Sequence, residues 1–392
     1  METTRLRAWR AHRQGLDGSL QGRSASEILV KTGWARSVGG AAPYLTLFAR
    51  GGLRRAEVDA DVDAVRIHEL PSARGCTYVL PGQDYALGLT VGQSFADGEA
   101  RVALRLGVTE KEIGDLKRTV VNSLTEGPLD TEDIRSRVGP AARSLGPEGV
   151  KKGLSTTLPV ALSLLQSEGE IRRVPIDGRI DGQRYRYGLW RPNPLSGLKP
   201  VQDGPFAELA RKFFFWTGGA TLGEFQWFSG LGAKAAKAAI EPLKLTPFAG
   251  ELLMLPEDRE ALERFREPAE PQYVLVSSLD GIVHLRRELI SLVDTKDTGH
   301  PLLQPPKPGK LMDLPDHAIL DRGRLTGLWA YDPDAGAIAW MSFVKPGRAM
   351  KEAVARMEQF IREDLGDARS FSLDSPKSRV PRIAALRKAA TA

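Results

Sequence analysis

A basic and aromatic segment at residues 170–191 carries the clearest chemical signal in this sequence. It reads EIRRVPIDGRIDGQRYRYGLWR and interleaves arginines with Tyr185, Tyr187 and Trp190. Guanidinium forks bind phosphates and fit the DNA minor groove, and aromatic rings stack on displaced bases. The candidate nucleic-acid contacts here are Arg172, Arg173, Arg179, Arg184 and Arg186. The alternative interpretation is an exposed hairpin with solvated arginines and a Tyr-Trp face turned to the core.

The other reactive residue types form no catalytic or metal-binding motif. The five histidines, at 12, 68, 284, 300 and 317, lack metal-ligand spacing, and the single cysteine, Cys76, excludes multi-cysteine zinc and iron-sulfur sites. The segments GGAAPYL and GATLGEF lack the lysine of a phosphate-binding loop. We therefore expect no metal and no cofactor, and an enzyme acting on a small molecule is disfavoured.

The elements that position the basic segment follow a recurring order of helices and then a strand or hairpin. In residues 1–108 we expect a helix with Ser24 or Ser26 as N-cap and Gly33 as its end, a helix over 59–72, and a strand over 76–82. In residues 109–195, TEKEIGDLKRTVVNSL predicts a helix, Asp130 caps a second, STTLPVALSLLQ gives a third, and DGRIDG predicts a hairpin. Residues 196–258 repeat this order in outline. Each of these three segments resembles a winged helix-turn-helix unit.

The residue pattern changes after residue 258, from helical segments to strand-like runs. YVLVSSL, HAILDRGRLTGLWAY and AIAWMSFV are strand-like runs separated by turn residues, and MKEAVARMEQFIREDLG predicts a closing helix. We therefore expect an α+β fold, with tandem winged helix-turn-helix motifs followed by a C-terminal β-barrel-like domain at 259–392.

Charge is concentrated at the C-terminal end of the sequence. The net charge is +6, but residues 377–392 hold five basic residues and no acidic one, so the remainder is nearly neutral. An isolated helix of this length is marginal in water, so we expect this tail to be a loose electrostatic arm, dispensable for folding. No signal segment or apolar stretch long enough to span a membrane is visible, so we expect a cytoplasmic, nucleoid-associated protein that makes no membrane contact.

Several segments together resemble the bacterial AlkZ- and YcaQ-like DNA glycosylases. They occur in the family's order and cover nearly the whole chain: GWARSVGGAAPYLTLFARGG, SARGCTYVLPGQDY, LTEGPLDTEDIRSRVG, LARKFFFWTGGATLGEFQWFSGL, VSSLDGIVHLRREL and HAILDRGRLTGLWAYDPDAGAIAW. The resemblance implies a concave DNA-binding surface that removes alkylated bases or unhooks crosslinks. It also implies DNA contacts by Trp34 and by Arg74, whose Arg-Gly pair matches the family's Arg-Gly-Thr-Leu-His run.

The chain departs from the family at the motif that carries catalysis. Active relatives have Gln-x-Gln or Gln-x-Asp shortly before a Pro-Tyr-Leu segment, and an ungapped register from Pro43 places Arg36, Ser37 and Val38 there. Arg36 and Ser37 are therefore the candidate catalytic residues by position. Glycosidic cleavage passes through an oxocarbenium-like state that a carboxylate or amide stabilises, so we also consider Asp280 in SLDGIVHL. The alternative role of Asp280 is the N-cap of the following helix.

These observations predict a DNA repair protein, a glycosylase that hydrolyses the N-glycosidic bond of alkylated or bulky-adduct bases. The expected partner is damaged double-stranded DNA, bound by a monomer. The alternative is a non-catalytic winged-helix DNA-binding protein or transcriptional regulator, which is normally a dimer that reads two half-sites.

Overall fold

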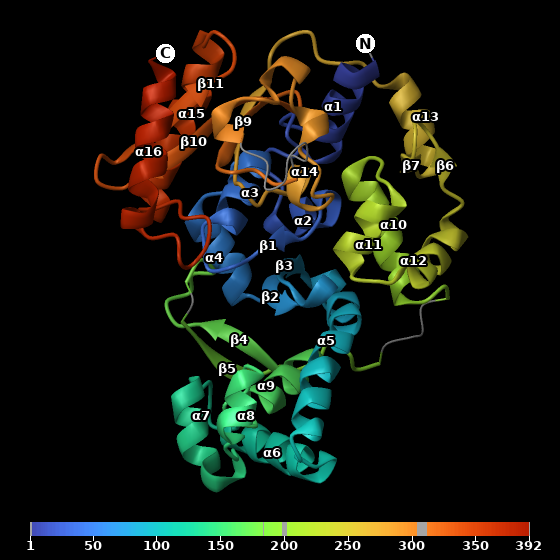
Figure 1. Ribbon diagram of the computed structural model, residues 1–392, viewed down its shortest axis with the longest axis vertical. Coiled ribbons are helices and arrows are strands. Elements are labelled where there is room, and N and C mark those ends of the chain that lie inside the picture. Colours follow the sequence, from blue (N-terminus) through green and yellow to red (C-terminus); the bar gives the residue numbers. More distant parts are fainter. Residues whose placement is uncertain (1, 183, 198–201, 304–311, 392) are drawn as a thin grey trace.

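The computed structural model describes every residue except 1, 183, 198–201, 304–311 and 392. Figure 1 shows one end of the molecule built from the helices and the hairpin of residues 110–189, and the other end built from both termini. The long helix α5 (Tyr85–Arg105) joins the two ends. The fold mixes helices and sheets, as the sequence predicts.

The N-terminal segment forms four helices and a small antiparallel sheet. The helices are α1 (Glu2–Arg13), α2 (Ala25–Thr32), α3 (Ala42–Gly51) and α4 (Arg55–Asp63), and the strands are β1 (Ala35–Arg36), β2 (Ile67–Pro71) and β3 (Thr77–Pro81). Ser24 caps α2 in a capping box with Glu27, and Gly33 ends it, as predicted. The sheet order β1-β3-β2 places β3 in the centre.

The prediction of one helix over 59–72 is wrong in its second half. Helix α4 ends at Asp63, Val65 takes a positive φ of 54°, and the chain continues as β2. A positive φ is unfavourable for a β-branched residue and cannot continue a right-handed helix. The segment Ile67–Pro71 instead pairs along its full length with β3.

The middle of the chain matches the predicted order of helices and hairpin. Its elements are α6 (Glu110–Ser123), α7 (Thr131–Val138), α8 (Gly146–Lys151), α9 (Leu158–Ser167), β4 (Ile171–Pro175) and β5 (Tyr185–Leu189). Asp130 caps α7 as predicted, and Thr109 caps α6 in a capping box. Helices α6, α7 and α9 share one hydrophobic core with the hairpin through Ile171 and Tyr187. The basic segment is therefore a hairpin held on a helical base.

The next segment continues with helices and a short strand pair. Its elements are α10 (Pro205–Thr217), α11 (Leu222–Ser229), α12 (Ala233–Ile240), β6 (Thr246–Pro247), β7 (Leu253–Met254) and α13 (Pro256–Arg264). The aromatic run in α10 is core, because Phe213, Phe214 and Trp216 are fully buried. This core also takes in Tyr78 and Leu80 of β3, so the segment packs directly on the N-terminal sheet.

The C-terminal segment holds an open antiparallel sheet. Its elements are β8 (Tyr273–Val276), α14 (Gly281–His284), β9 (His317–Asp321), β10 (Arg324–Asp332), β11 (Ala337–Ser342), α15 (Arg348–Phe360) and α16 (Pro376–Ala390). The strand order is β11-β10-β9-β8, and among the described residues the two edge strands do not pair to close a barrel. The predicted closing helix is present as α15, which a wider turn over Ile361–Leu365 extends.

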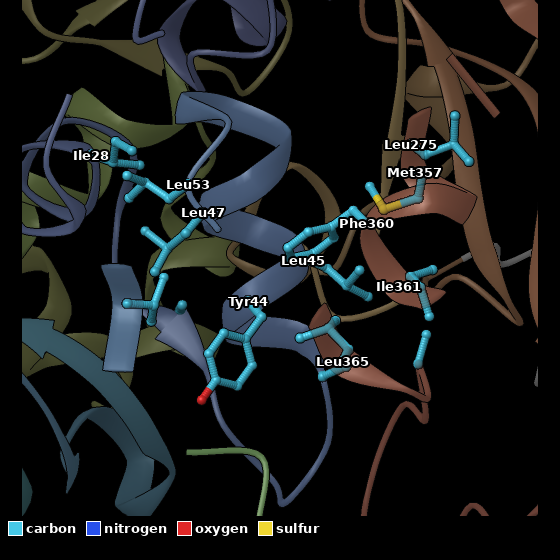
Figure 2. Packing of buried hydrophobic residues seen from close by; sticks show 14 of the residues in the cluster. Ile28, Tyr44, Leu45, Leu47, Leu53, Leu275, Met357, Phe360, Ile361 and Leu365 are labelled. Carbon is cyan, nitrogen blue, oxygen red and sulfur yellow. The ribbon is translucent and has the colours of Figure 1, made fainter. Parts of the chain in front are cut away.

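One hydrophobic core joins the two ends of the sequence. Figure 2 shows Leu45 and Tyr44 of α3 in the same cluster as Leu275 of β8, Met357 and Phe360 of α15, and Leu365. The rings of Phe48 and Phe360 stack with centroids 3.9 Å apart. The predicted segments 1–108 and 259–392 therefore share a core and support each other's position.

The expectation of a loose C-terminal tail is wrong. Residues 376–390 form α16, which packs on β10 and β11 with Ile383 and Leu386 buried. Arg379 is also buried, and its guanidinium donates to both carboxylate oxygens of Asp367 at 2.8 Å. The helix is marginal alone, but tertiary packing stabilises it here. None of the described helices is both long and apolar enough to cross a membrane.

Candidate functional site

The sheet β1-β3-β2 brings two polar side chains to one face. Ala35 and Glu69 both lie opposite Val79, on either side of β3. Side chains directly opposite each other, and those two residues apart on a strand, point to the same face. Ser37, two residues after Ala35, therefore shares the face of Glu69, and its backbone N–H donates to the Thr77 carbonyl at 3.1 Å. The sheet places a hydroxyl and a carboxylate together.

A pocket of about 560 Å³ lies elsewhere, against α1 and α13, but one of about 550 Å³ opens at this face. Its walls come from the loop after β1, from β2, from the turn before β3 and from the hairpin. The lining residues are Arg36, Ser37, Val38, Gly39, Glu69, Gly75, Cys76, Thr77, Arg173, Gly182 and Tyr185. The positions that replace the family's catalytic motif, Arg36 to Val38, therefore all line one cavity.

Glu69 supplies the carboxylate of this pocket. It is partly buried, and burial raises the pKa of its carboxyl group above the ordinary value. The Arg173 guanidinium, 3.9 Å away, acts in the opposite direction, as do the Ser37 hydroxyl and Arg36. A carboxylate in such surroundings is poorly hydrated yet faces cationic groups, an arrangement that is frequent at functional sites.

Ser37 and Arg173 frame this carboxylate. Ser37 is buried, and its Oγ makes no hydrogen bond of ordinary geometry to a described residue. Arg173 donates from Nε to the Gln166 side chain at 3.1 Å and lies 4.4 Å over the Tyr185 ring. The guanidinium is therefore held in place on the pocket wall, and the Ser37 hydroxyl lies beside the Glu69 carboxylate, where both can contact a water molecule or a ligand.

Arg36 and Arg74 belong to a basic and aromatic cluster beside the pocket. Arg36 donates from Nη1 to the Thr77 carbonyl at 2.6 Å and lies 5.4 Å over the Tyr78 ring. Arg74 stacks 3.8 Å over the Trp227 ring. Burial, followed by the charge of Arg36, lowers the pKa of the nearby His284 to about 4. Arg36 is thus fixed by a backbone carbonyl and an aromatic ring, and Arg74 by the Trp227 ring and the Cys76 sulfur, and neither forms a salt bridge with another described residue.

The hairpin arginines differ in whether their side chains pair with other described residues. Arg179 makes a bidentate ion pair with Asp181, at 2.8 and 2.5 Å, and also reaches the Leu365 carbonyl. Arg172 is half-buried, and burial lowers the pKa of its guanidinium. Arg184 and Arg186 are exposed, and no side-chain contact ties them to another described residue. These two are the hairpin arginines open to an external anion.

Trp34 and Asp280 lie inside the protein. Trp34 is buried and donates from Nε1 to Asp84 at 2.8 Å. Asp280 is fully buried, accepts from the Ile282 N–H at 3.0 Å as the N-cap of α14, and pairs with the buried Arg50. The N-cap interpretation of Asp280 is therefore confirmed. Neither side chain reaches a surface where it could contact a substrate.

Glu69 is the pocket residue that the sequence analysis missed. It lies in the segment that was predicted as helix, where a glutamate is most often a solvated surface residue. The available signal was the run Ile67–Pro71 before the strand-like CTYVLPG, which fits a hairpin of two strands. As a strand, this run places Glu69 opposite Val79 of β3 and on the same face as Ser37.

Three comparisons with known proteins place the chain among its relatives. The model of the DNA glycosylase AlkZ-like family matches residues 34–363, a range that contains the whole pocket. Among solved structures, the Streptomyces sahachiroi DNA glycosylase AlkZ has a TM-score of 0.65 and 18% sequence identity, covering 94% of this chain and 98% of that one. At this identity the likeness shows a shared fold. No curated protein matches the chain in sequence.

Proposed function

Because the chain belongs to the AlkZ-like DNA glycosylase family, we propose that it hydrolyses the N-glycosidic bond of alkylated or bulky-adduct bases in double-stranded DNA. The observation that carries this proposal is the Glu69 carboxylate, which lies beside Ser37 in the pocket that the motif positions line. The family's motif supplies amide or acid groups, and here the other edge strand, β2, supplies an acid on the face that Ser37 shares.

The chemistry needs few groups when the base is already cationic. Alkylation at N3 or N7 of a purine makes the base a good leaving group, and cleavage leaves positive charge on the sugar. The ionised Glu69 carboxylate would stabilise that charge and accept a proton from the attacking water. Ser37 would hold the same water through its hydroxyl group, which lies beside the Glu69 carboxylate. Arg173 favours the ionised state of Glu69 by its charge.

Arg36 has a different role in this scheme. A guanidinium beside the sugar would repel the developing cation, so Arg36 cannot replace the family's amide. Its side chain is held by the Thr77 carbonyl and over Tyr78, in the wall of the pocket that Glu69 also lines. We assign Arg36, together with Arg74, to holding phosphate groups next to the pocket.

The hairpin and its helical base would bind the flanking duplex. We propose that residues 1–108, 109–195 and 196–258 are three winged helix-turn-helix units, the middle of which uses β4–β5 as its wing. Arg184 and Arg186 would contact phosphates, and Arg172 would join them by a small movement. Arg173 and Arg179 serve to hold the hairpin and the pocket wall. The protein would act as a monomer on chromosomal DNA in the cytoplasm.

The experiment is incubation of the protein with methylated and bulky-adduct duplexes, followed by alkaline cleavage at abasic sites. We expect cleavage with bulky adducts and weaker cleavage with simple N-methylpurines, because Arg36 occupies a motif position. Glu69→Gln should abolish the signal, and Glu251→Gln, at an exposed acid whose side chain pairs with no other described residue, should not. Equal activity of Glu69→Gln and wild type would remove Glu69 from the mechanism.

A non-catalytic DNA-binding protein is the second candidate, favoured by one observation. Neither Arg36 nor Val38 reproduces the amide or acid of the family motif. A protein of this kind would bind the same duplexes and release no base. It would also be expected to dimerise if it served as a regulator of two half-sites.

A further inference from the structure

An apolar loop tip stands next to the candidate pocket. Residues 369–374 form a turn between α15 and α16, called here the tip loop. In it Phe371 is 45% exposed and Leu373 is 82% exposed. Single exposed apolar residues are common on protein surfaces, so exposure alone decides little. What distinguishes this pair is how firmly the surrounding backbone is held.

Contacts on three sides fix the tip loop. The Ser370 N–H donates to Asp374 at 2.9 Å, and Asp374 is itself paired with Arg382 at 3.2 Å. The Ser370 hydroxyl lies 3.1 Å from that of Ser278. Gly40 approaches the loop so closely that a Cβ would come within 2.5 Å of the Ser370 carbonyl oxygen. The loop is therefore a rigid support that presents two apolar side chains to the outside.

The same loop connects both walls of the pocket. The Ser372 N–H donates to the carbonyl of Val38, a pocket residue of the first wall, at 3.1 Å. Arg369 donates to the carbonyl of Asp181 at 2.8 Å, next to Gly182 of the hairpin wall. The tip loop therefore keeps a fixed position relative to Ser37 on one side and to the wing hairpin on the other.

We propose that Phe371 and Leu373 form a wedge that enters the base stack of duplex DNA beside the nucleotide held in the pocket. This inference rests on the proposed function, because the occupant of the pocket is then a DNA nucleotide. Apolar side chains that insert between base steps unstack them and bend the duplex. A nucleotide that leaves the stack leaves a gap, and a rigid apolar tip fills that gap at little entropic cost.

The surrounding charge fits this partner. Arg184 on the adjacent hairpin and Lys377 at the start of α16 are exposed basic residues, and the acidic Asp181 and Asp374 are buried. The apolar tip is therefore flanked by two exposed basic residues that can contact a phosphate backbone.

The test uses a duplex in which 2-aminopurine lies next to a bulky adduct, since the fluorescence of 2-aminopurine rises when it unstacks. We expect the wild-type protein to raise this fluorescence on binding. The double variant F371S/L373S should lose most of the rise and bind the duplex about tenfold more weakly, through loss of stacking contacts. Ile290→Ser is the matched control, because Ile290 is 48% exposed and lies outside the three proposed winged helix-turn-helix units. Circular dichroism and thermal melting confirm that both variants are folded.

Three outcomes would overturn the wedge. The first is an unchanged fluorescence rise in F371S/L373S. The second is a wild-type protein that releases base with no unstacking of the neighbour. The third is a wild-type dimer that the double variant converts to a monomer, which would make the tip loop a subunit contact. Wild-type protein that binds no duplex would instead refute the proposed function itself.

Discussion

Replacing Asp280 by asparagine tests whether this acid is structural or catalytic. Its carboxylate accepts hydrogen bonds from Arg50 Nη1 at 2.7 Å and Nη2 at 2.8 Å. Asp280 is 0% exposed and Arg50 is 1% exposed. The pair also joins the N-cap of α14 to α3, and its two residues are 230 positions apart in the sequence. Asparagine keeps the size of the side chain and its capping ability but removes the charge.

The expected effect is large and falls on stability. Removing one partner of a buried ion pair leaves the other charge uncompensated and costs about 3–5 kcal/mol. Asn is as good an N-cap as Asp, so the cap adds little to this loss. Because the whole free energy of unfolding of a domain is about 5–15 kcal/mol, Asp280→Asn should remove a large fraction of it. Arg50→Met combined with Asp280→Asn should recover part of the loss, because the isolated charge is then gone.

Urea unfolding followed by circular dichroism measures the loss of unfolding free energy in Asp280→Asn and its recovery in the double variant. The double-mutant cycle over Arg50→Met, Asp280→Asn and their combination should give a favourable coupling energy between the two residues. A variant Asp280→Asn that unfolds at the wild-type urea midpoint but releases no damaged base would refute this reasoning. Asp280 would then act on the substrate.

Three further predictions follow from particular contacts. The double variant Arg184→Ala/Arg186→Ala should reduce the slope of log affinity against log salt concentration by about 1.8, at about 0.9 per phosphate contact. The control Arg348→Ala, on the exposed face of α15, should leave this slope unchanged. Deletion of residues 376–392 should lower the free energy of unfolding by roughly 3–6 kcal/mol, because Ile383 and Leu386 lose their burial, and an unchanged melting temperature would mean that α16 does not dock. The His317 ring accepts a hydrogen bond from the Ser278 N–H at 2.9 Å, and its other nitrogen lies 2.9 Å from the Ala368 carbonyl oxygen. Burial lowers the pKa of His317 from 6.5 to about 4. The contribution of neutral His317 to the free energy of unfolding should therefore be complete above pH 6.5 and lost as the pH falls toward 4. Equilibrium unfolding across this pH range should show a smaller loss for His317→Gln than for wild type, and parallel profiles would contradict the assignment.

Local signals explain the elements that the sequence predicts correctly. Ser24, Asp130 and Asp280 each cap the helix that their position indicates, because the capping side chain and the amide it binds lie within three residues. The hairpin β4–β5 follows from the turn residues of DGRIDG and the alternation on both sides. Such features are encoded where they occur, so they can be read without knowledge of the fold.

Long-range contacts explain what the sequence could not provide. The strand β2 forms because β3 pairs with it. Without that strand, the sequence does not predict that Glu69 lies on the same face as Ser37. Helix α16 is stable because β10 and β11 cover its buried face. The partner of Asp280, Arg50, follows from no local pattern. The candidate site thus depends on Glu69 and Arg173, which only tertiary structure brings to Ser37.

The single-turnover rate of base release at saturating protein tests the catalytic pocket most directly. Mass spectrometry of the solution detects the free modified base, and a parallel titration gives the duplex affinity. We predict that wild-type protein releases the free base, and that Glu69→Gln lowers the rate by about 100-fold or more while the affinity changes little. Duplexes that remain bound and intact with wild-type protein, for every lesion offered, would contradict the catalytic role and leave a DNA-binding protein.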